Sequence, residues 1–361
     1  MTEQTAVCQL RTLLLDWFDA HKRDLPWRHT DDPYRIWVSE IMLQQTQVDR
    51  VITYYDRFLN AFPTVQTLAE APLEAVLKLW EGLGYYSRAR NLHRAAGIIL
   101  NEHGGRFPRT MDEARALPGV GAYAAGAILS IACGERVPAI DANVKRVLAR
   151  LFCIEGDPER GQARARIARL ATDAVPEDRP GEFNQALMEL GALICVARTP
   201  GCLLCPVAEV CLARQQGIQA RIPPPRRSVT IYQQAIAALV ERDGKYLLAR
   251  RPSKGVWGGL WEFPNRVTES IPDHRSALKE LLCRDFGLEV RVVEMLTRLR
   301  YGIMDRQVEL SAYVCVYQAG EAAATNHTQV RWLSPAELSE PAMPSPHRAV
   351  AEILSETLRR L

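Results

Sequence analysis

Two features that would direct a chain to a membrane or out of the cell are missing from this sequence. No eighteen consecutive residues are apolar, and residues 1–9 contain no basic segment followed by an apolar run. There is also no internal repeat and no low-complexity tract. With 47% hydrophobic and 24% charged residues, the composition is that of a soluble globular protein. We therefore expect a cytoplasmic protein that neither spans nor binds a membrane.

The sequence also has little excess charge. Residues 1–220 carry 25 Lys and Arg against 26 Asp and Glu. The net charge of +3 comes mostly from Arg221, Arg226 and Arg227. Bulk charge therefore does not predict nucleic-acid binding, and an argument for it has to rest on local motifs.

The nine cysteines are not distributed as a disulfide framework would require. Four of them, Cys195, Cys202, Cys205 and Cys211, have the spacing C-x6-C-x2-C-x5-C, and the other five are scattered. An odd number with one dense group indicates a metal centre in a reducing compartment. Four thiolates suit either zinc or a [4Fe-4S] cluster, and the spacing alone leaves both open.

The chain is long enough for two domains, and its pattern changes once. Residues 1–220 are predicted to be all-α, and the Pro- and Arg-rich residues 221–232 to form an extended linker. Residues 233–361 are predicted to be α+β. There we expect strands at 234–240, 246–249 and 308–317, a main helix at 276–286 and a terminal helix at 348–359.

Two segments of the first domain carry candidate catalytic and DNA-binding groups. The turn Leu117-Pro118-Gly119-Val120-Gly121 lies between two helical patterns, where glycines allow backbone N–H groups to approach a phosphate. About twenty residues later, Asp141 stands at a helix start in the segment 139–144. The turn and the carboxylate together resemble the helix-hairpin-helix superfamily of DNA glycosylases.

A third segment carries a carboxylate inside a helix. Asp32-Pro33 begins a helix that we expect to run through Val48. Glu40 lies on a largely apolar face of that helix, so burial should raise its pKa and keep part of it protonated near neutral pH. A general acid needs this property. The segment 36–47, I-W-V-S-E-I-M-L-Q-Q-T-Q, is similar to the signature of the adenine glycosylase (MutY) family, and the resemblance extends over nearly the whole chain.

The resemblance implies a mechanism. Glu40 would protonate adenine, and Asp141, kept ionised by the helix N-terminus, would stabilise the sugar cation or bond to C1′. Tyr123 and Asn143 would orient Asp141 and the attacking water. Tyr123 stands where lyases of the superfamily have a lysine, and a phenol cannot form an imine, so we expect base removal without strand cleavage.

The resemblance also implies cofactor and binding residues. The four cysteines would hold a [4Fe-4S] cluster that positions a loop around Arg198. Arg23, Trp27, Arg28, Leu43 and Gln185 would line the adenine pocket. The remaining DNA contacts would come from the helix end, a Gly-rich segment and the hairpin: Gln44, Gln45, Tyr85, Leu117, Gly119, Val120 and Gly121.

The second domain resembles a MutT-like Nudix fold. A working Nudix helix needs glutamates that hold a divalent metal, whereas the matching segment 280–288 keeps only one acidic residue at a glutamate position. We expect an inactive domain that recognises 8-oxoguanine, with Ser345 and His347 as candidate reading residues. In the family's Ser-His loop the two residues are adjacent, whereas here Pro346 separates them.

The sequence therefore predicts a monomeric adenine glycosylase that acts on A·8-oxoguanine or A·G mispairs in double-stranded DNA. It would be associated with the nucleoid and open to contact with replication or repair proteins. Three alternatives remain to be weighed: a bifunctional glycosylase and lyase, disfavoured by Tyr123; a nucleotide pyrophosphohydrolase, disfavoured by the broken Nudix helix; and a module that only marks damaged DNA, disfavoured by the Glu40 and Asp141 pair.

Overall fold

The computed structural model describes residues 2–224 and 229–360. These residues form two compact units, one made of residues 1–70 and 91–226 and the other of 71–90 and 227–361. Residues 225–228 of the expected linker at 221–232 lie outside the described residues. No helix among the described residues is long and apolar enough to cross a membrane.

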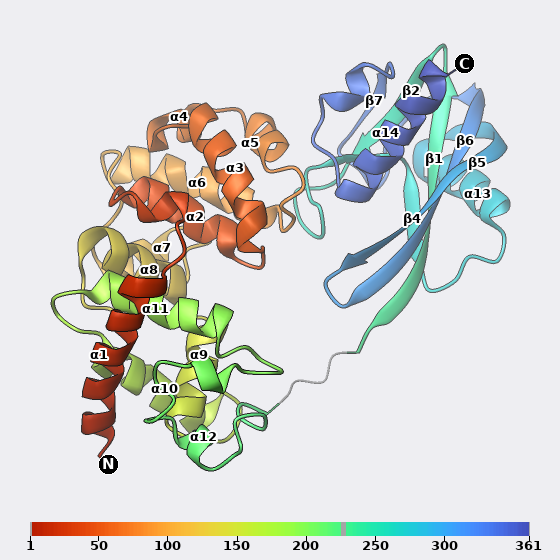
Figure 1. The fold of residues 1–361 in the computed structure, drawn as a ribbon. Helices are drawn as coiled ribbons and strands as arrows, with labels where there is room; N and C mark the ends of the chain where they lie inside the picture. The colour runs from red at the N-terminus through yellow and green to blue at the C-terminus, as the bar shows by residue number, and fades with distance from the viewer. Residues whose placement is uncertain (1, 225–228, 361) are drawn as a thin grey trace. The chain divides into compact units, whose positions relative to one another are not determined.

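The first unit is helical (Figure 1). Its elements are α1 (Glu3–His21), η1 (Pro26–Arg28), α2 (Pro33–Leu43), α3 (Val48–Ala61), α4 (Val65–Glu70), most of α6 (Ser87–Glu102), α7 (Met111–Ala116), α8 (Ala122–Cys133), α9 (Ala142–Leu151), α10 (Gly161–Ala174), α11 (Pro180–Leu193), η2 (Cys202–Leu204) and α12 (Leu212–Gln215).

The helix that was expected to run from Pro33 through Val48 is interrupted. Asp32 caps its start by accepting the N–H of Tyr34. α2 ends at Leu43, and Gln45 has a φ of 59°, a conformation that a right-handed helix cannot contain. α3 then begins at Val48. The apolar pattern crosses this break, which is why the sequence predicted one long helix.

The hairpin joins α7 to α8. Gly119 has a φ of 80°, and a Cβ added there would lie 2.8 Å from the Cβ of Asn91. Both the left-handed backbone and the close approach require glycine at this position. The side chains of Leu117 and Val120 are buried, so they anchor the turn, while Gly119 and Gly121 are exposed.

Helix contacts in the first unit bring the expected site segments together. α2 packs on α8, and both α8 and α9 pack on α11. A Cβ on Gly191 in α11 would lie 2.5 Å from the Cβ of Asn143, so glycine lets α11 approach the start of α9 this closely. This packing places Glu40, Tyr123 and Asp141 around one cavity.

The second unit is an α+β fold around one sheet. Its elements are α5 (Leu73–Leu79), β1 (Ile231–Arg242), β2 (Lys245–Arg250), β3 (Trp261–Glu262), β4 (Asn265–Thr268), α13 (His274–Phe286), β5 (Leu288–Ile303), β6 (Arg306–Gly320), β7 (Gln329–Leu333), η3 (Glu337–Ser339) and α14 (Ser345–Arg359). The strand order is β3-β2-β1-β6-β5, with β4 beside β1 and β7 beside β2.

The sheet has a hydrophobic core on each face. Along β1, Ala235, Ala237 and Leu239 join the core that contains residues of α14, while the intervening residues join the core that contains residues of α13. β1 pairs in parallel with β6, and the other strand pairs are antiparallel. A helix therefore covers each face of the sheet (Figure 1).

The three expected strands correspond to β1, β2 and β6, and the two expected helices to α13 and α14. The sequence analysis did not identify β5, although Leu288, Val290 and Val292 are buried in alternation. Register shifts interrupt that alternation between Val292 and Glu294 and again between Met295 and Thr297. Beyond the bulges the alternation resumes, with Leu299, Tyr301 and Ile303 partly buried between exposed neighbours, so the period of two is broken only around residues 293–297.

Candidate active site

The first unit contains a small pocket, with a cavity of about 200 Å³. This is below the range of about 300–1,000 Å³ that is usual for pockets binding drug-sized ligands, so it suits one small planar group. All nine residues that the sequence assigned to catalysis and adenine binding line it: Glu40, Tyr123, Asp141 and Asn143 with Arg23, Trp27, Arg28, Leu43 and Gln185.

Glu40 is a buried carboxyl, only 5% exposed, on α2. Burial raises its pKa to about 7, because the charged form loses its water. The phenol of Tyr123 donates a hydrogen bond of 2.7 Å to Oε2 and opposes the rise, while the negative charge of Asp141 adds to it. A substantial share of Glu40 is therefore protonated at neutral pH.

Asp141 caps the start of α9. Its Oδ1 accepts the N–H of Val144 at 2.7 Å, and its Oδ2 accepts the amide of Asn143 at 2.8 Å. Burial nevertheless raises the pKa of Asp141 above its ordinary value, and these hydrogen bonds oppose the rise. We had expected the helix N-terminus to dominate, but desolvation outweighs it. The charge of Asp141 in turn raises the pKa of Glu40, so the two buried carboxyls are electrostatically coupled.

Tyr123 projects from α8 close to its start. Besides Glu40, its hydroxyl contacts the sulfur of Met188 at 3.3 Å. Burial raises the pKa of Tyr123 well above its ordinary value, so the phenol stays protonated and acts as a donor. No lysine lines the pocket.

The sequence analysis missed one group that organises this pocket, Glu189. It is only 2% exposed and lies one helical turn after Gln185 on α11. Arg23 donates to Glu189 at 2.8 and 2.6 Å, and Arg28 at 3.2 and 3.1 Å. Although burial opposes it, these hydrogen bonds lower the pKa of Glu189 to about 2. Glu189 follows Gln185 by four residues and therefore lies on the same face of the helix. This spacing is the sequence signal that could have identified it.

The four-cysteine segment follows α11. Cys195, Cys205 and Cys211 pack beside the core formed by α1, α9, α10 and α11, and none of the four forms a disulfide. The pKa of Cys205 is raised to about 11, mainly by burial and in part by the charges of the other three thiols. Four thiolates this close need a compensating positive charge.

Two arginines of α9 bind the cysteine segment. Arg150 is buried and donates to the carbonyls of Cys195, Val196, Ala197 and Ile222 and to the sulfur of Cys195 at 3.3 Å. Arg146 donates to the Cys195 carbonyl and to Oδ1 of Asn143, both at 2.7 Å. Among the described residues, no group of three or more His, Cys, Asp or Glu side chains is arranged to hold a single metal ion.

Most of the expected DNA-contacting residues of the first unit lie at its surface, but two side chains of the hairpin are buried. Gln45 and Arg198 are exposed, and Gln44 is partly exposed at the end of α2. Leu117 and Val120 are each only 3% exposed, so their side chains cannot be the contacting groups. In the hairpin, contact with a phosphate is left to the exposed backbone at Gly119 and Gly121.

The second unit has a cavity of its own, of about 570 Å³. It is lined by Leu83, Gly84, Tyr85, Tyr86, Ser87, Arg90, Gly255, Val256, Trp257, Tyr301, Gly302, Ile303, Met304, Ser345 and Pro346. Tyr85 is 46% exposed, with a φ of 45°. The rings of Trp257 and Tyr301 lie 5.7 Å apart, and Met304, in the turn between β5 and β6, is 75% exposed.

The two candidate reading residues of α14 differ. Ser345 lines this cavity, but His347 is 2% exposed and does not line it. Burial lowers the pKa of His347 to about 4, and its neutral ring accepts the N–H of Phe263 at 3.3 Å. The structure therefore gives His347 a packing role and does not present it to a base.

The residual Nudix helix is α13. Of its acidic groups, Asp285 pairs with Arg284 at 2.6 Å, and Glu280 pairs with Arg266 at 3.1 Å. The segment has no cluster of carboxylates that could hold a divalent cation, in keeping with the search of the described residues. The expected loss of pyrophosphatase chemistry stays a prediction.

Two family models match the chain. The model for the HhH-GPD superfamily of base excision DNA repair proteins matches residues 38–172, and that for the NUDIX domain matches residues 235–352. These matches agree with a helix-hairpin-helix glycosylase domain followed by a Nudix-like α+β domain.

The chain is similar over most of its length to characterised enzymes. It is 35% identical to the adenine DNA glycosylase of Rattus norvegicus, over 98% of this chain and 79% of the relative. It is also 35% identical to the adenine DNA glycosylase of Homo sapiens, over 96% of this chain and 74% of the relative.

Solved structures agree on the fold of the helical part. A thermostable thymine-DNA glycosylase has a TM-score of 0.55 at 31% identity, covering 59% of this chain and 98% of the other. An endonuclease III trapped on DNA has a TM-score of 0.52 at 23% identity, covering 60% and 99%. The second likeness concerns the fold alone.

Proposed function

The chain belongs to the adenine DNA glycosylases, and from that premise we propose that the pocket around Glu40 excises adenine paired with 8-oxoguanine or guanine. The chain is a base excision repair enzyme that acts on DNA and hydrolyses an N-glycosyl bond. The observation that carries the proposed mechanism is a buried carboxyl with a pKa of about 7, beside a second carboxyl, in a cavity of about 200 Å³.

Glu40 is the general acid. Its protonated carboxyl donates a proton to N7 of adenine, and the electron pair of the bond between C1′ and N9 leaves with the base. Protonation makes adenine a better leaving group, and general acid catalysis of this kind is typically worth about 10²–10⁴-fold. Tyr123, whose hydroxyl donates to Oε2, holds the carboxyl in place.

Asp141 stabilises the positive charge that develops on the sugar, or bonds transiently to C1′. Its fixed position at the start of α9, where it accepts hydrogen bonds from Val144 and Asn143, supports this role. Asn143, which donates to Oδ2 of Asp141, orients the carboxylate. Water then adds to C1′ and gives its proton to Glu40, which restores the acid.

The reaction stops at an abasic site. Strand cleavage by a lyase needs an amine that forms an imine with C1′, and the corresponding position carries the neutral phenol of Tyr123. The comparisons with named adenine DNA glycosylases do not favour the bifunctional lyase or the pyrophosphohydrolase.

Adenine has to leave the helical stack to reach this pocket. Arg23 and Arg28, held by Glu189, and Gln185, which accepts from Arg28 at 3.2 Å, supply polar groups for its edge. Trp27 and Leu43 supply apolar walls. Gln45, exposed at the break after α2, fills space beside the base that stays behind, and the hairpin glycines and Arg198 contact the backbone.

The opposite base is read by the second unit. The cavity there combines a half-exposed tyrosine, three further aromatic residues and Ser345, which suits a planar base with polar edges. We assign this cavity to 8-oxoguanine, with Tyr85 stacking beside the base.

The four cysteines hold a [4Fe-4S] cluster. Their donor set suits one, since the four thiols come from one short segment, Cys195 to Cys211, and none of them forms a disulfide. When bound, the cluster supplies positive charge that stabilises four thiolates and fixes the loop around Arg198. Arg150 fixes the same loop through its carbonyls.

The test is a glycosylase assay on duplexes with one A·8-oxoguanine, A·G or A·T pair. We expect adenine release from the first two, with a strand that breaks only after alkali or heat, and no trapping of the protein by borohydride. Release from A·T at the same rate would contradict mispair specificity. Robust borohydride trapping would contradict the assignment of a monofunctional enzyme.

A further inference from the structure

Residues 71–90 lie within the helical half of the sequence, yet they form one compact unit with residues 227–361. This segment, which we call the docking segment, contains α5, the loop 80–86 and the first turn of α6. It also carries Tyr85. The contacts that hold it to the α+β fold therefore decide where Tyr85 stands relative to the cavity of that fold.

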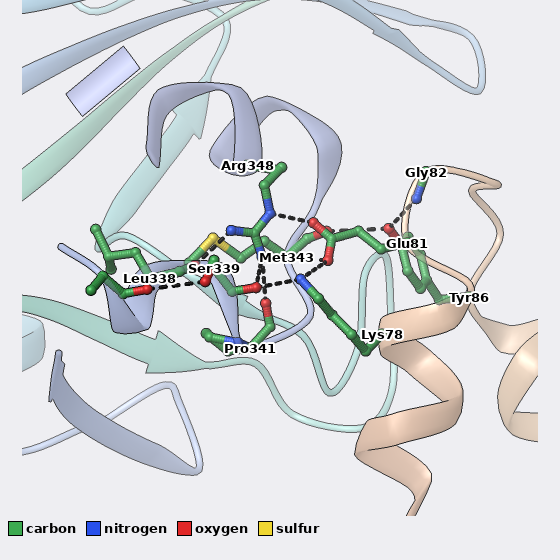
Figure 2. A network of polar contacts seen from close by, with 10 residues as sticks. Lys78, Glu81, Gly82, Tyr86, Leu338, Ser339, Pro341, Met343 and Arg348 are labelled. Atoms are coloured by element: carbon green, nitrogen blue, oxygen red, sulfur yellow. Dashed lines mark hydrogen bonds and ion pairs between the residues drawn. The ribbon is translucent and has the colours of Figure 1, made fainter. Parts of the chain in front are cut away.

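A network of polar contacts centred on Glu81 joins the docking segment to the α+β fold (Figure 2). Arg348 in the first turns of α14 donates to both carboxylate oxygens of Glu81. Lys78 donates to Glu81 at 2.9 Å and to the carbonyl of Ser339 at 2.6 Å. Arg348 also donates to the carbonyls of Leu338 and Pro341, each at 2.6 Å.

The ion pair is largely shielded from water. The side chains of Arg348 and Glu81 are 16% and 12% exposed. A charge pair at this depth depends on geometry, because neither group recovers full hydration if its partner is lost. The fork of Arg348 donates to three backbone carbonyls and one carboxylate at once, so it fixes Glu81 relative to η3 and α14.

Further contacts attach the loop 80–86 and helix α5 to the α+β fold. The hydroxyl of Tyr86 donates to the carbonyl of Met343 at 3.2 Å and accepts the N–H of Gly82 at 3.2 Å. The indole N–H of Trp261 donates to Glu74 at 3.1 Å. Figure 2 shows the contact of Arg348 with Glu81 and that of Tyr86 with Gly82 as dashed lines.

These contacts lie directly beside the cavity assigned to the opposite base. Residues 83–87 of the docking segment form one part of its lining, and Trp257, Tyr301 and Ser345 of the α+β fold form another. The cavity is therefore composite. Arg348 follows Ser345 by three residues on α14, so the residue that anchors the docking segment belongs to the same helical turn as a lining residue of the cavity.

We propose that Glu81 and Arg348 are positioning residues for opposite-base discrimination: their ion pair holds the loop that carries Tyr85 against the α+β fold, so that both sides of the cavity meet the base together. This inference rests on the proposed function, since it assumes that this cavity reads the opposite base. Neither residue lines the cavity, so their effect is exerted through the placement of the loop.

The test uses the full chain and the variants Glu81→Gln, Arg348→Met and the double variant. Glu280→Gln is the matched control, because it makes the same chemical change in an ion pair, with Arg266, that lies within residues 227–361 alone. Single-turnover excision is measured on A·8-oxoguanine and A·G duplexes. Hydrogen exchange of residues 80–87 is followed in the free protein, where no substrate is involved.

We expect each single variant to lower the ratio of the two excision rates by roughly 2- to 30-fold, the range of mutations that change coupling between sites. The double variant should be no worse than the poorer single variant, because both remove the same contact. Residues 80–87 should exchange faster in these variants than in wild type or in Glu280→Gln.

Two results would overturn the proposal. One is a ratio of the two excision rates that stays at the wild-type value although wild type discriminates, as it would if both rates fell equally. The other is additive losses in the double variant. If wild type itself fails to discriminate, the failure lies in the assignment of the cavity and not in the ion pair.

Discussion

At the scale of single residues, the environment of Glu40 decides the chemistry. A mid-helix glutamate on a surface would be ionised and inert at neutral pH. Here α2, α8 and α11 bury the carboxyl, and only one phenol hydrogen-bonds to its Oε2. Desolvation therefore exceeds hydrogen bonding, and the pKa rises to about 7.

Replacing the acid should remove catalysis without removing the fold. Glu40→Gln keeps the volume and can still accept from Tyr123, but it has no proton to donate. We expect single-turnover excision to fall by at least about 10²-fold, with mispaired DNA still bound in a gel-shift or anisotropy assay. Excision near the wild-type rate would remove Glu40 from the mechanism.

The raised pKa of Glu40 also predicts a pH dependence with a definite sign. The protonated carboxyl is the active form, and it is lost as pH rises through about 7. Under subsaturating conditions, where the free enzyme titrates, the excision rate should fall about tenfold per pH unit above that value. The residual activity of Glu40→Gln should lack this limb. A wild-type rate that is flat between pH 7 and 9 would contradict the assignment.

At the scale of elements, the contact between α9 and the cysteine segment depends on one buried side chain. Arg150 donates to four carbonyls and one sulfur while being only 2% exposed. A single buried side chain thus satisfies the backbone of a segment that has little regular structure of its own. Such a segment depends on side chains for hydrogen bonds that a helix or sheet would supply.

Arg150→Met should therefore destabilise the first unit by roughly 2–4 kcal/mol, because it leaves buried carbonyls without a donor. At this size the melting temperature should drop by about 4–16 °C, and the visible absorption of an iron–sulfur cluster per chain should decrease. Arg166→Met, which breaks only an exposed pair with Glu3, is the control and should change little. Equal melting temperatures for the two variants would show that Arg150 is dispensable.

At the scale of the whole molecule, the two units do not coincide with the two halves of the sequence. The boundary at residue 220 was expected to separate catalysis from recognition, but the docking segment 71–90 belongs to the second unit. The second unit is therefore joined to the first through the peptide bonds at residues 70–71 and 90–91, besides the linker.

Removing residues after Arg221 tests this arrangement. The active-site pocket lies wholly in the first unit, so adenine excision should remain measurable, whereas the preference for 8-oxoguanine over guanine should fall. Truncation also leaves Glu81 and Glu74 without Arg348 and Trp261, so the truncated protein should melt at a lower temperature. An unchanged rate ratio on A·8-oxoguanine and A·G duplexes would exclude the second unit from reading the opposite base.

Much of the catalytic site could be predicted because the sequence signals that identify it each span only a few residues. The cap at Asp141, the glycines of the hairpin, the apolar face around Glu40 and the cysteine spacing all depend on residues a few positions apart. The nine residues expected at catalysis and adenine binding do line one pocket. Their individual roles, and the cluster, stay predictions.

Tertiary structure decided what depends on distant partners. Glu189 was missed because its importance comes from Arg23 and Arg28, more than 160 positions away. His347 was expected to help read 8-oxoguanine, but it is only 2% exposed and accepts the N–H of Phe263. Asp141 was expected to be governed by its cap, but burial by neighbouring helices raises its pKa.

The sequence by itself determined the chemical groups and the local turns, because capping, periodicity and ligand spacing act over a few residues. Only the folded chain decided how deeply each group is buried and which distant charges it meets. Desolvation and long-range pairing set both the pKa of Glu40 and the attachment of the docking segment to α14. Both depend on how packing excludes water and brings distant charged groups together, and no local sequence pattern determines either.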